Sequence, residues 1–435
     1  MTVVMAILAS YYHVFVGRTA LIFQNRFRMS VLFFIFANEM KKKLFVFLYA
    51  CLTLPLMAQT DIPVEGSLPW PQSLQARIDT ILTTPLLETT QLGLMVYDLT
   101  ADSTLYTFGH RQRLRPASTM KVVTAVAALD RLGSDYQLTT SIYNTGTISG
   151  GTLRGNLYVV GGMDPMFDRS DMIAFVNKMR HLGIDTICGS ILVDLSFKDN
   201  DRLGEGWCWD DDNPVLTPLL YDSKDCFVEQ LSRELQRDGV VIIDTSYRAP
   251  LSSRRLIATR SHSVGEVLVR MMKESDNLYA ESLFYHLGRT SGNKQSTGKS
   301  AASQVRQMIQ KVGLQPGDYR VADGSGLSLY NYVSAELEVS MLRYAWQHAE
   351  LFRQLNIVLP VAGVDGTLKG RMKNTVAERN VHAKTGSVSG ISSLAGFCTA
   401  PNGHELCFSI INQGVSRMSD GRNFQDQICV ALCGE

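Results

Sequence analysis

Patterns of apolar and polar residues predict strands in two separate parts of this chain. Residues 92–98 alternate as a strand, Ala101–Asp102 forms a turn, and residues 104–108 return as a second strand. Three further strands are predicted over residues 382–386, 393–398 and 405–411. Two helices are predicted outside these strands, over residues 70–82 and 424–432. A terminal helix packed on a sheet of first and last strands would bring both ends of the chain into one domain.

The segment from residue 134 to residue 254 has a different pattern, in which short strands alternate with amphipathic helices. Strands are predicted over residues 137–146, 153–162, 189–194 and 240–244, and helices over residues 171–182 and 226–237. A segment of about 120 residues is long enough for one small domain. We therefore expect an inserted α/β domain at 134–254, interrupting a larger catalytic domain made of residues 59–133 and 255–435.

Three more helices are predicted after the inserted segment, over residues 263–273, 299–312 and 334–355. The first of them begins with a capping box formed by Ser263 and Glu266. Together these patterns predict the α/β (α+β) class, with helices around an antiparallel sheet.

The composition is that of a globular protein and excludes several other classes. The chain is 45% hydrophobic and 19% charged, with a formal net charge of +1. The sequence contains no basic patch of the kind that would indicate nucleic-acid binding. The seven cysteines after residue 58 have no regular spacing, so they predict no disulfide framework. No cluster of metal-ligand type is present in the sequence, and we expect neither a metal nor a cofactor.

The N-terminus carries a targeting pattern. Residues 40–58 read as a signal peptide, with three lysines, an apolar run and a small residue before the expected cleavage point. Residues 1–39 make no sense upstream of a signal peptide, so we interpret them as an extension from a wrongly chosen start codon. Two alternatives stay open, an N-terminal membrane segment and a lipoprotein with Cys51 as the lipidated residue.

The chemistry centres on residues 116–133, which read PASTMKVVTAVAALDRLG. The spacing predicts a helix that begins near Ser118 and ends at Gly133. Ser118 and Lys121 are three positions apart and therefore share one helix face, where the amine can act as base for the hydroxyl. The alternative is an ordinary N-cap serine with Lys121 in solvent.

Two later stretches favour the chemical interpretation. Ser275-Asp276-Asn277 and Lys384-Thr385-Gly386 follow in the order S-x-x-K, S-D-N, K-T-G. This ordered set is that of penicillin-binding proteins and class A β-lactamases. The chain therefore resembles a serine acyl-enzyme of the penicillin-recognising kind.

Longer motifs narrow the resemblance to one family. PASTMK, GGMDP, W-x-WDD, SDNLYAE, DGSGLS, LPVAGVDGTLKGR and KTGSVSGISSLAGF are similar to the class C low-molecular-mass penicillin-binding proteins. These are D-alanyl-D-alanine carboxypeptidases and endopeptidases of the bacterial periplasm. The resemblance implies a β-lactamase/transpeptidase-like domain interrupted by an insertion, with peptidoglycan stem peptides as substrates and β-lactams as covalent inhibitors.

The resemblance also assigns catalytic roles. Ser118 would attack the carbonyl between the terminal D-alanines, and Lys121 would accept its proton. Ser275 would relay a proton to the leaving amine. Asn277 would bind the substrate amide and help to hold Lys121, and Lys384 would supply a positive field.

Substrate-binding roles follow in the same way. Thr385 and Ser387 would offer hydroxyls to the substrate carboxylate, and Gly386 would leave room for a substrate strand. The backbone N–H groups of Ser118 and Ser387 would form the oxyanion hole. Asp164 in GGMDP would contact the diamino acid of a neighbouring stem peptide, or else cap a turn.

Other residues of these motifs have simpler expected roles. We expect Asp276 to be structural, and Trp207, Trp209, Asp210 and Asp211 to hold the inserted segment against the rest of the chain. Asp365 and Thr367 are expected mainly as turn residues that could approach the cleft.

Two other functions remain to be weighed. A β-lactamase would need a glutamate on a loop to activate the deacylating water, and no E-x-x-L-N pattern lies between Ser118 and Lys384. A cell-wall or β-lactam-binding module without activity is the non-enzymatic alternative, although all three motifs retain their reactive residues.

Overall fold

The fold is described from a computed structural model, which covers residues 68–210, 213–244 and 254–434. The proposed extension at 1–39, the signal peptide at 40–58, Cys51 and Asp211 lie outside the described residues. Within the described part of the chain, no helix is both long enough and apolar enough to cross a membrane.

A five-stranded antiparallel sheet joins the two ends of the described chain. Its strand order is β11-β12-β13-β1-β2, so the last strand pairs with the first. The strands are β1 (Gln91–Asp98), β2 (Ser103–Phe108), β11 (His382–Val388), β12 (Ile391–Thr399) and β13 (Glu405–Gln413). The five strands predicted from the sequence are thus confirmed, each with slightly wider bounds.

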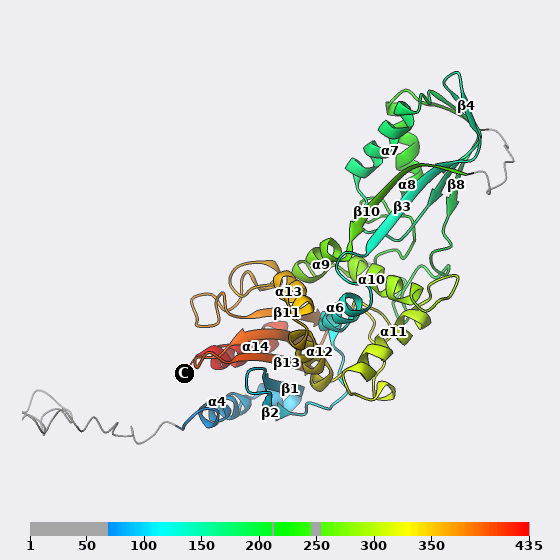
Figure 1. The fold of residues 1–435 in the computed structure, drawn as a ribbon. Coiled ribbons are helices and arrows are strands. Elements are labelled where there is room, and N and C mark those ends of the chain that lie inside the picture. The colour runs from blue at the N-terminus through cyan, green and yellow to red at the C-terminus, as the bar shows by residue number, and fades with distance from the viewer. Residues whose placement is uncertain (1–67, 211–212, 245–253, 435) are drawn as a thin grey trace, which may run out of the picture. The chain divides into compact units, whose positions relative to one another are not determined.

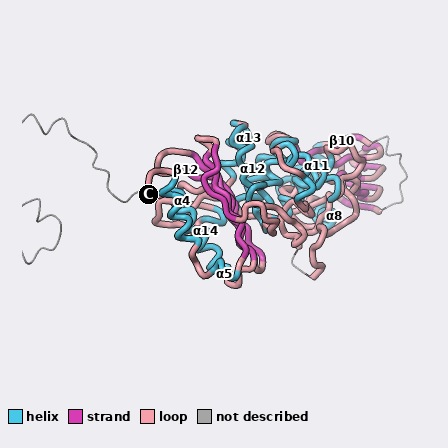
Figure 2. The backbone as a smooth tube through the Cα atoms, turned by 90° about the horizontal axis from the view of Figure 1, so that it is seen from below, coloured by secondary structure: helices cyan, strands magenta, loops and turns pink. Residues whose placement is uncertain are grey.

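Both faces of this sheet are covered by helices. Leu406, Phe408 and Ile410 of β13 face a core shared with α4 (Gln72–Leu82) and α14 (Met418–Cys433). The alternate residues Cys407 and Ile411 face the opposite core. Burial on both faces explains why this strand reads as a nearly continuous apolar run. Figures 1 and 2 show α4 and α14 beside the sheet.

The opposite core is built from six helices, of which five contact the sixth, α6. They are α6 (Met120–Arg131), α9 (Val264–Lys273), α10 (Asn277–Arg289), α11 (Gly298–Lys311), α12 (Ala335–Gln347) and α13 (Ala349–Val358). The single helix predicted over 334–355 is wrong, because the chain turns at His348, which ends α12 and begins α13. The pattern also missed α10, whose residues 278–288 are all buried and therefore lack an amphipathic stripe.

The inserted segment has its own apolar core between two small sheets and two helices, α7 (Arg169–His181) and α8 (Phe227–Arg237). The sheet orders are β10-β3-β6-β8 and β4-β5-β7-β9. The strands are β3 (Gln137–Asn144), β4 (Thr147–Ser149), β5 (Thr152–Arg154), β6 (Leu157–Val160), β7 (Thr186–Cys188), β8 (Ile191–Asp194), β9 (Val241–Ile243) and β10 (Arg255–Ser263).

Two details of this segment differ from the pattern. The single strand predicted over 153–162 is two strands in different sheets, separated at Gly155, whose φ of +154° suits glycine. Strand β10 lies beyond the boundary expected at residue 254, yet it pairs with β3. The sheet of the inserted segment therefore continues to Ser263, and the proposed division at 134–254 remains a prediction.

Candidate active site

Ser118 lies in a tight 3₁₀ turn, Ala117–Thr119, that leads directly into α6. Ala117 has a φ of +49°, a conformation that costs energy for a residue with a side chain. Thr119, and not Ser118, occupies the N-cap position of α6. Every residue from Met120 to Leu129 is buried. The alternative of a capping serine with a solvent-exposed Lys121 is therefore wrong.

The amine of Lys121 is fully buried and has three oxygen neighbours. Lys121 Nζ is 2.9 Å from Ser118 Oγ, 2.8 Å from Asn277 Oδ1 and 2.8 Å from the carbonyl oxygen of Ser325. Two of these oxygens belong to carbonyl groups, which only accept hydrogen bonds. A neutral amine can donate its two N–H groups to them and direct its lone pair at the Ser118 hydroxyl.

Burial also favours the neutral form of this amine. It lowers the pKa of Lys121 to about 8, although the negative charges of Asp323, Glu281 and Asp276 act in the opposite direction. A lysine with this pKa is a far better base near neutral pH than an exposed lysine.

The second motif places Ser275 between α9 and α10. Ser275 has a φ of +63°, and its Oγ lies 2.8 Å from Lys384 Nζ. Asp276 caps α10 by accepting hydrogen bonds from the N–H groups of Leu278 and Tyr279, which is the structural role expected for it. The cap fixes the first turn of α10, from which Asn277 reaches Lys121.

Lys384 lies on β11, the edge strand of the five-stranded sheet, and is fully buried. Its Nζ also donates to the carbonyl oxygen of Thr385 at 2.8 Å. Burial, together with the positive charge of Lys121, lowers the pKa of Lys384 well below its usual value. The charge of Lys121 thus acts on Lys384, and the field that Lys384 was expected to exert on Lys121 remains a prediction.

Strand β11 approaches the Ser118 turn closely because residue 386 is glycine. A Cβ atom at Gly386 would lie 2.1 Å from Ser393 Oγ, 2.7 Å from the carbonyl oxygen of Pro116 and 3.0 Å from the Ser118 nitrogen. The absence of this atom lets the backbone after Lys384 lie beside the Ser118 N–H. This is the arrangement that an oxyanion hole of Ser118 and Ser387 requires.

These elements enclose a cleft of about 530 Å³. Four predicted site residues line it, namely Ser118, Ser275, Thr385 and Ser387. Four further lining residues come from the loop before β11 and from α14, namely Thr367, Gly370, Arg371 and Arg422.

Three of these further residues, all with polar side chains, were not among the predicted site residues. Thr367, expected mainly as a turn residue, has its hydroxyl 2.7 Å from that of Thr385. Arg371, which pairs with Asp426, and Arg422 were not predicted at all. The motif LPVAGVDGTLKGR contained a signal for Arg371. Arg422 had none, because the C-terminal helix was expected to begin only at residue 424.

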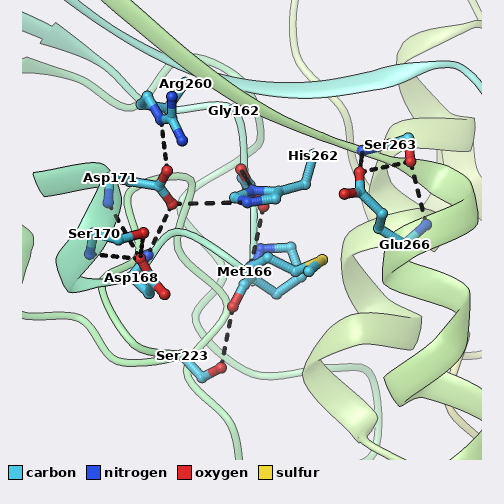
Figure 3. Close-up of polar contacts among 12 residues, drawn as sticks. Gly162, Met166, Asp168, Ser170, Asp171, Ser223, Arg260, His262, Ser263 and Glu266 are labelled. Atoms are coloured by element: carbon cyan, nitrogen blue, oxygen red, sulfur yellow. Dashed lines mark hydrogen bonds and ion pairs between the residues drawn. The ribbon is translucent and has the colours of Figure 1, made fainter. Parts of the chain in front are cut away.

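Asp164 does not join this cleft. It is 1% exposed, and its carboxylate accepts hydrogen bonds from His262 Nδ1 at 2.8 Å and from the Met166 N–H at 3.0 Å. Figure 3 shows the surroundings, with Asp171 between Arg260 and His262. Here Asp164 fixes the turn after β6, so the expected contact with a substrate would require its pair with His262 to open.

No cluster of metal-ligand type occurs among the described residues. The cleft offers a hydroxyl beside a buried amine, a second hydroxyl beside a second amine, and backbone N–H groups. A fold of this kind, with a serine hydroxyl beside a buried lysine amine in its cleft, defines the class of serine acyl-enzymes.

Comparison with known proteins agrees with this class. The model of the D-Ala-D-Ala carboxypeptidase 3 (S13) family matches residues 74–219 and 216–433. The chain belongs to this family of serine peptidases, which confirms the resemblance drawn from the motifs.

Curated relatives cover most of the chain. The D-alanyl-D-alanine carboxypeptidase DacB of Haemophilus influenzae is 26% identical, over 77% of this chain and 88% of that protein. The D-alanyl-D-alanine carboxypeptidase of Actinomadura sp. (strain R39) is 28% identical, over 88% of this chain and 89% of that protein. Among solved structures, penicillin binding protein 4 (dacB) of H. influenzae superimposes with a TM-score of 0.72 at 23% identity, covering 82% of this chain and 98% of that chain. The last likeness confirms the fold.

Proposed function

We propose that this enzyme hydrolyses the bond between the two terminal D-alanines of peptidoglycan stem peptides through an acyl-enzyme on Ser118, and that penicillins acylate the same serine. The observation that carries this proposal is the 2.9 Å contact between Lys121 Nζ and Ser118 Oγ on a buried helix start. Membership of the S13 family supports the substrate class.

Acylation begins when Ser118 Oγ attacks the carbonyl carbon of the substrate while its proton passes to the neutral amine of Lys121. The negative charge on the carbonyl oxygen is stabilised by the N–H groups of Ser118 and Ser387, each of which contributes about 3 kcal/mol. The C–N bond then breaks, and Ser275 relays a proton to the leaving amine. D-alanine is released, and water later cleaves the ester and restores Ser118.

The substrate lies along the outer edge of β11. At the start of this edge, His382 forms an isolated β-bridge with Val361. Further along, Thr385 and Ser387 line the cleft. An extended peptide can add to such an edge as a further strand. Its terminal carboxylate then meets the hydroxyls of Thr385 and Ser387, close to the positive charge available at Lys384.

We also propose that the enzyme acts in the periplasm, where peptidoglycan lies. The signal-peptide pattern of residues 40–58 supports this location. Carboxypeptidase and crosslink endopeptidase activities would use the same catalytic groups, so both belong to the proposal.

Mass spectrometry of the protein tests the reaction class. We expect a persistent penicilloyl adduct on the peptide that contains Ser118, and release of D-alanine from a pentapeptide ending in D-Ala-D-Ala. An adduct without release, but with cleavage of a crosslinked dimer, would restrict the activity to endopeptidase work. No adduct and no cleavage would refute the proposal.

A β-lactamase would instead turn the penicillin over rapidly. Its deacylation needs a carboxylate that activates water. Among the described residues that line the cleft there is no aspartate or glutamate. We therefore expect the penicilloyl adduct to be long-lived.

The rate of acylation should depend on pH through the buried amine. Because the reactive form of Lys121 is neutral and its pKa is about 8, the rate of penicillin acylation should rise from pH 6 and level off above about pH 8. Glu281, whose pKa burial raises to about 8, titrates in the same range, so the apparent value belongs to the coupled groups. Stopped-flow acylation at constant ionic strength measures this profile. A rate that is flat from pH 6 to 9 would contradict a lysine base.

Gly386→Ala should separate β11 from the Ser118 turn. The added methyl group would meet Ser393 Oγ and the Pro116 carbonyl oxygen, and should lower the free energy of unfolding by about 1–3 kcal/mol. Displacement of one oxyanion donor should lower the acylation rate about 100-fold. Gly317→Ala is the matched control, because a Cβ atom there has nothing within 4 Å. Equal acylation rates for the two variants would show that the close approach at Gly386 is unimportant.

A further inference from the structure

Asp323 is a buried carboxylate that the proposed reaction does not use. It is 1% exposed, at the start of the loop that supplies a carbonyl oxygen to Lys121. Four N–H groups donate to it. Oδ1 accepts from Gly326 N at 2.8 Å and Asn331 Nδ2 at 2.6 Å, and Oδ2 accepts from Ser328 N at 2.6 Å and Trp207 Nε1 at 2.8 Å. Both carboxylate oxygens are therefore fully hydrogen-bonded, as a buried polar group requires.

One of these donors connects Asp323 to the active-site amine through a single peptide group. The N–H of Gly326 and the carbonyl of Ser325 belong to the same peptide unit. The N–H donates to Asp323, while the oxygen accepts from Lys121 Nζ at 2.8 Å. Hydrogen bonds in such a chain polarise one another, so the carboxylate strengthens the hold of the carbonyl oxygen on the amine.

The loop is also seated against the turn that carries the nucleophile. Gly326 has a φ of +81°, and a Cβ atom there would lie 1.8 Å from the carbonyl oxygen of Ala117. Gly324 accepts a 2.6 Å hydrogen bond from Thr124 Oγ1 of α6 through its carbonyl oxygen. A shift of this loop would therefore displace both the amine of Lys121 and the Ser118 turn.

The fourth donor comes from the inserted segment. Trp207 is half-buried, and the residues before it contact the same loop, since the carbonyl oxygen of Glu205 accepts from Ser328 Oγ at 2.6 Å. Glu205 also pairs with Arg320 at 2.7 Å. Trp209, two residues further on, is 84% exposed. The inserted segment thus contacts the loop through the indole N–H of Trp207 and the carbonyl oxygen of Glu205.

We propose that Asp323 is a positioning residue for Lys121, and that the indole N–H of Trp207 holds Asp323 in this role, which couples the inserted segment to the catalytic base. The inference rests on the proposed function, in which Lys121 is that base. It goes beyond the expectation that Trp207 only holds the inserted segment in place.

The proposal has a directional consequence. The charged groups around Lys121 are Asp323 on the loop, Glu281 and Asp276 on α10, and Lys384 on β11. If Asp323 loses the Trp207 donor, its negative charge is less dispersed and stabilises the ammonium form of Lys121 more strongly. The apparent pKa for acylation should rise, and the rate at neutral pH should fall.

Trp207→Phe tests this consequence, with Trp209→Phe as the matched control. Because a hydrogen bond to a charged group is stronger than one between neutral groups, and only part of its effect reaches Lys121, we expect about a fivefold slower penicillin acylation at pH 7. The rate should return to that of the unaltered enzyme at pH 9.5. Trp209→Phe should match the unaltered enzyme at every pH. A purely structural role for Trp207 would lower the rate by the same factor across the whole pH range.

Trp207→His provides a rescue, because its Nε2–H occupies the place of the indole N–H on a five-membered ring. If Trp207→Phe is unstable, the profile of Trp207→His still tests the proposal, since it should follow that of the unaltered enzyme. Superimposable profiles for Trp207→Phe and the unaltered enzyme, or a pH-independent loss, would overturn the proposal. The proposed function is judged separately, by loss of acylation in Lys121→Met.

Discussion

Ser118→Ala should abolish covalent labelling by penicillin and lower D-alanine release by about 10⁴-fold or more, the scale seen when a catalytic nucleophile is removed. The reason is geometric. Ser118 Oγ is the hydroxyl that lies beside the buried amine of Lys121, and it opens on the cleft. The other cleft serines do not replace it, because Ser275 contacts Lys384 and Ser387 lies on the edge strand.

The measurement is intact-protein mass spectrometry after incubation with penicillin, together with thermal unfolding. Ser232→Ala on α8 is the control, because its exposed hydroxyl donates only to the Val228 carbonyl oxygen within its own helix. Both variants should unfold like the unaltered enzyme. Continued labelling of Ser118→Ala would mean that another residue is the nucleophile.

Lys121→Met should lower acylation by about 10³-fold, within the range that general-base catalysis contributes. Methionine fills the buried volume of the lysine stem and removes only the amine that accepts the Ser118 proton. The rise of the acylation rate with pH near pH 8 should also disappear, because the group that titrates there has been removed.

Lys373→Met serves as the control for this change, because Lys373 is exposed in the loop before β11. Rates at pH 7 and pH 10 separate a lost base from a misfolded site, provided that both variants retain cooperative unfolding. If Lys121→Met still shows the rise in rate near pH 8, this rise belongs to another titrating group. Glu281, whose pKa is also about 8, is then the first candidate.

The candidate catalytic residues could be located in the sequence because they lie in short motifs. Ser118 and Lys121 lie one helical turn apart, so local geometry alone brings them together. The contact of Asn277 with Lys121 spans a long stretch of sequence, and only the resemblance predicted it. The contact of Lys384 with Ser275 was not predicted. The third partner of Lys121 was not predictable, because it is the backbone oxygen of Ser325, which leaves no side-chain signal.

The missed features share physical causes. Helix α10 is buried all round, so it has no apolar stripe, and the break at His348 follows no proline or glycine. Asp164 could be interpreted as a substrate ligand because the sequence does not reveal that the ring of His262 is hydrogen-bonded to its carboxylate. In each case the structure depends on tertiary contacts, which the local sequence pattern does not contain.

The pairing of β1 with β13 determines the order in which the enzyme can be assembled. Gln91 and Gln413, at one end of this pair, are 322 positions apart, and closing so long a loop is slow and entropically unfavourable. The strand that carries Lys384 and Gly386 joins the sheet only through β12 and β13, so the Ser118 turn meets its partner strand late. A nascent chain holds the nucleophile long before it holds a cleft. The cleft is thus complete only after the C-terminal strands and α14 have been added to the chain.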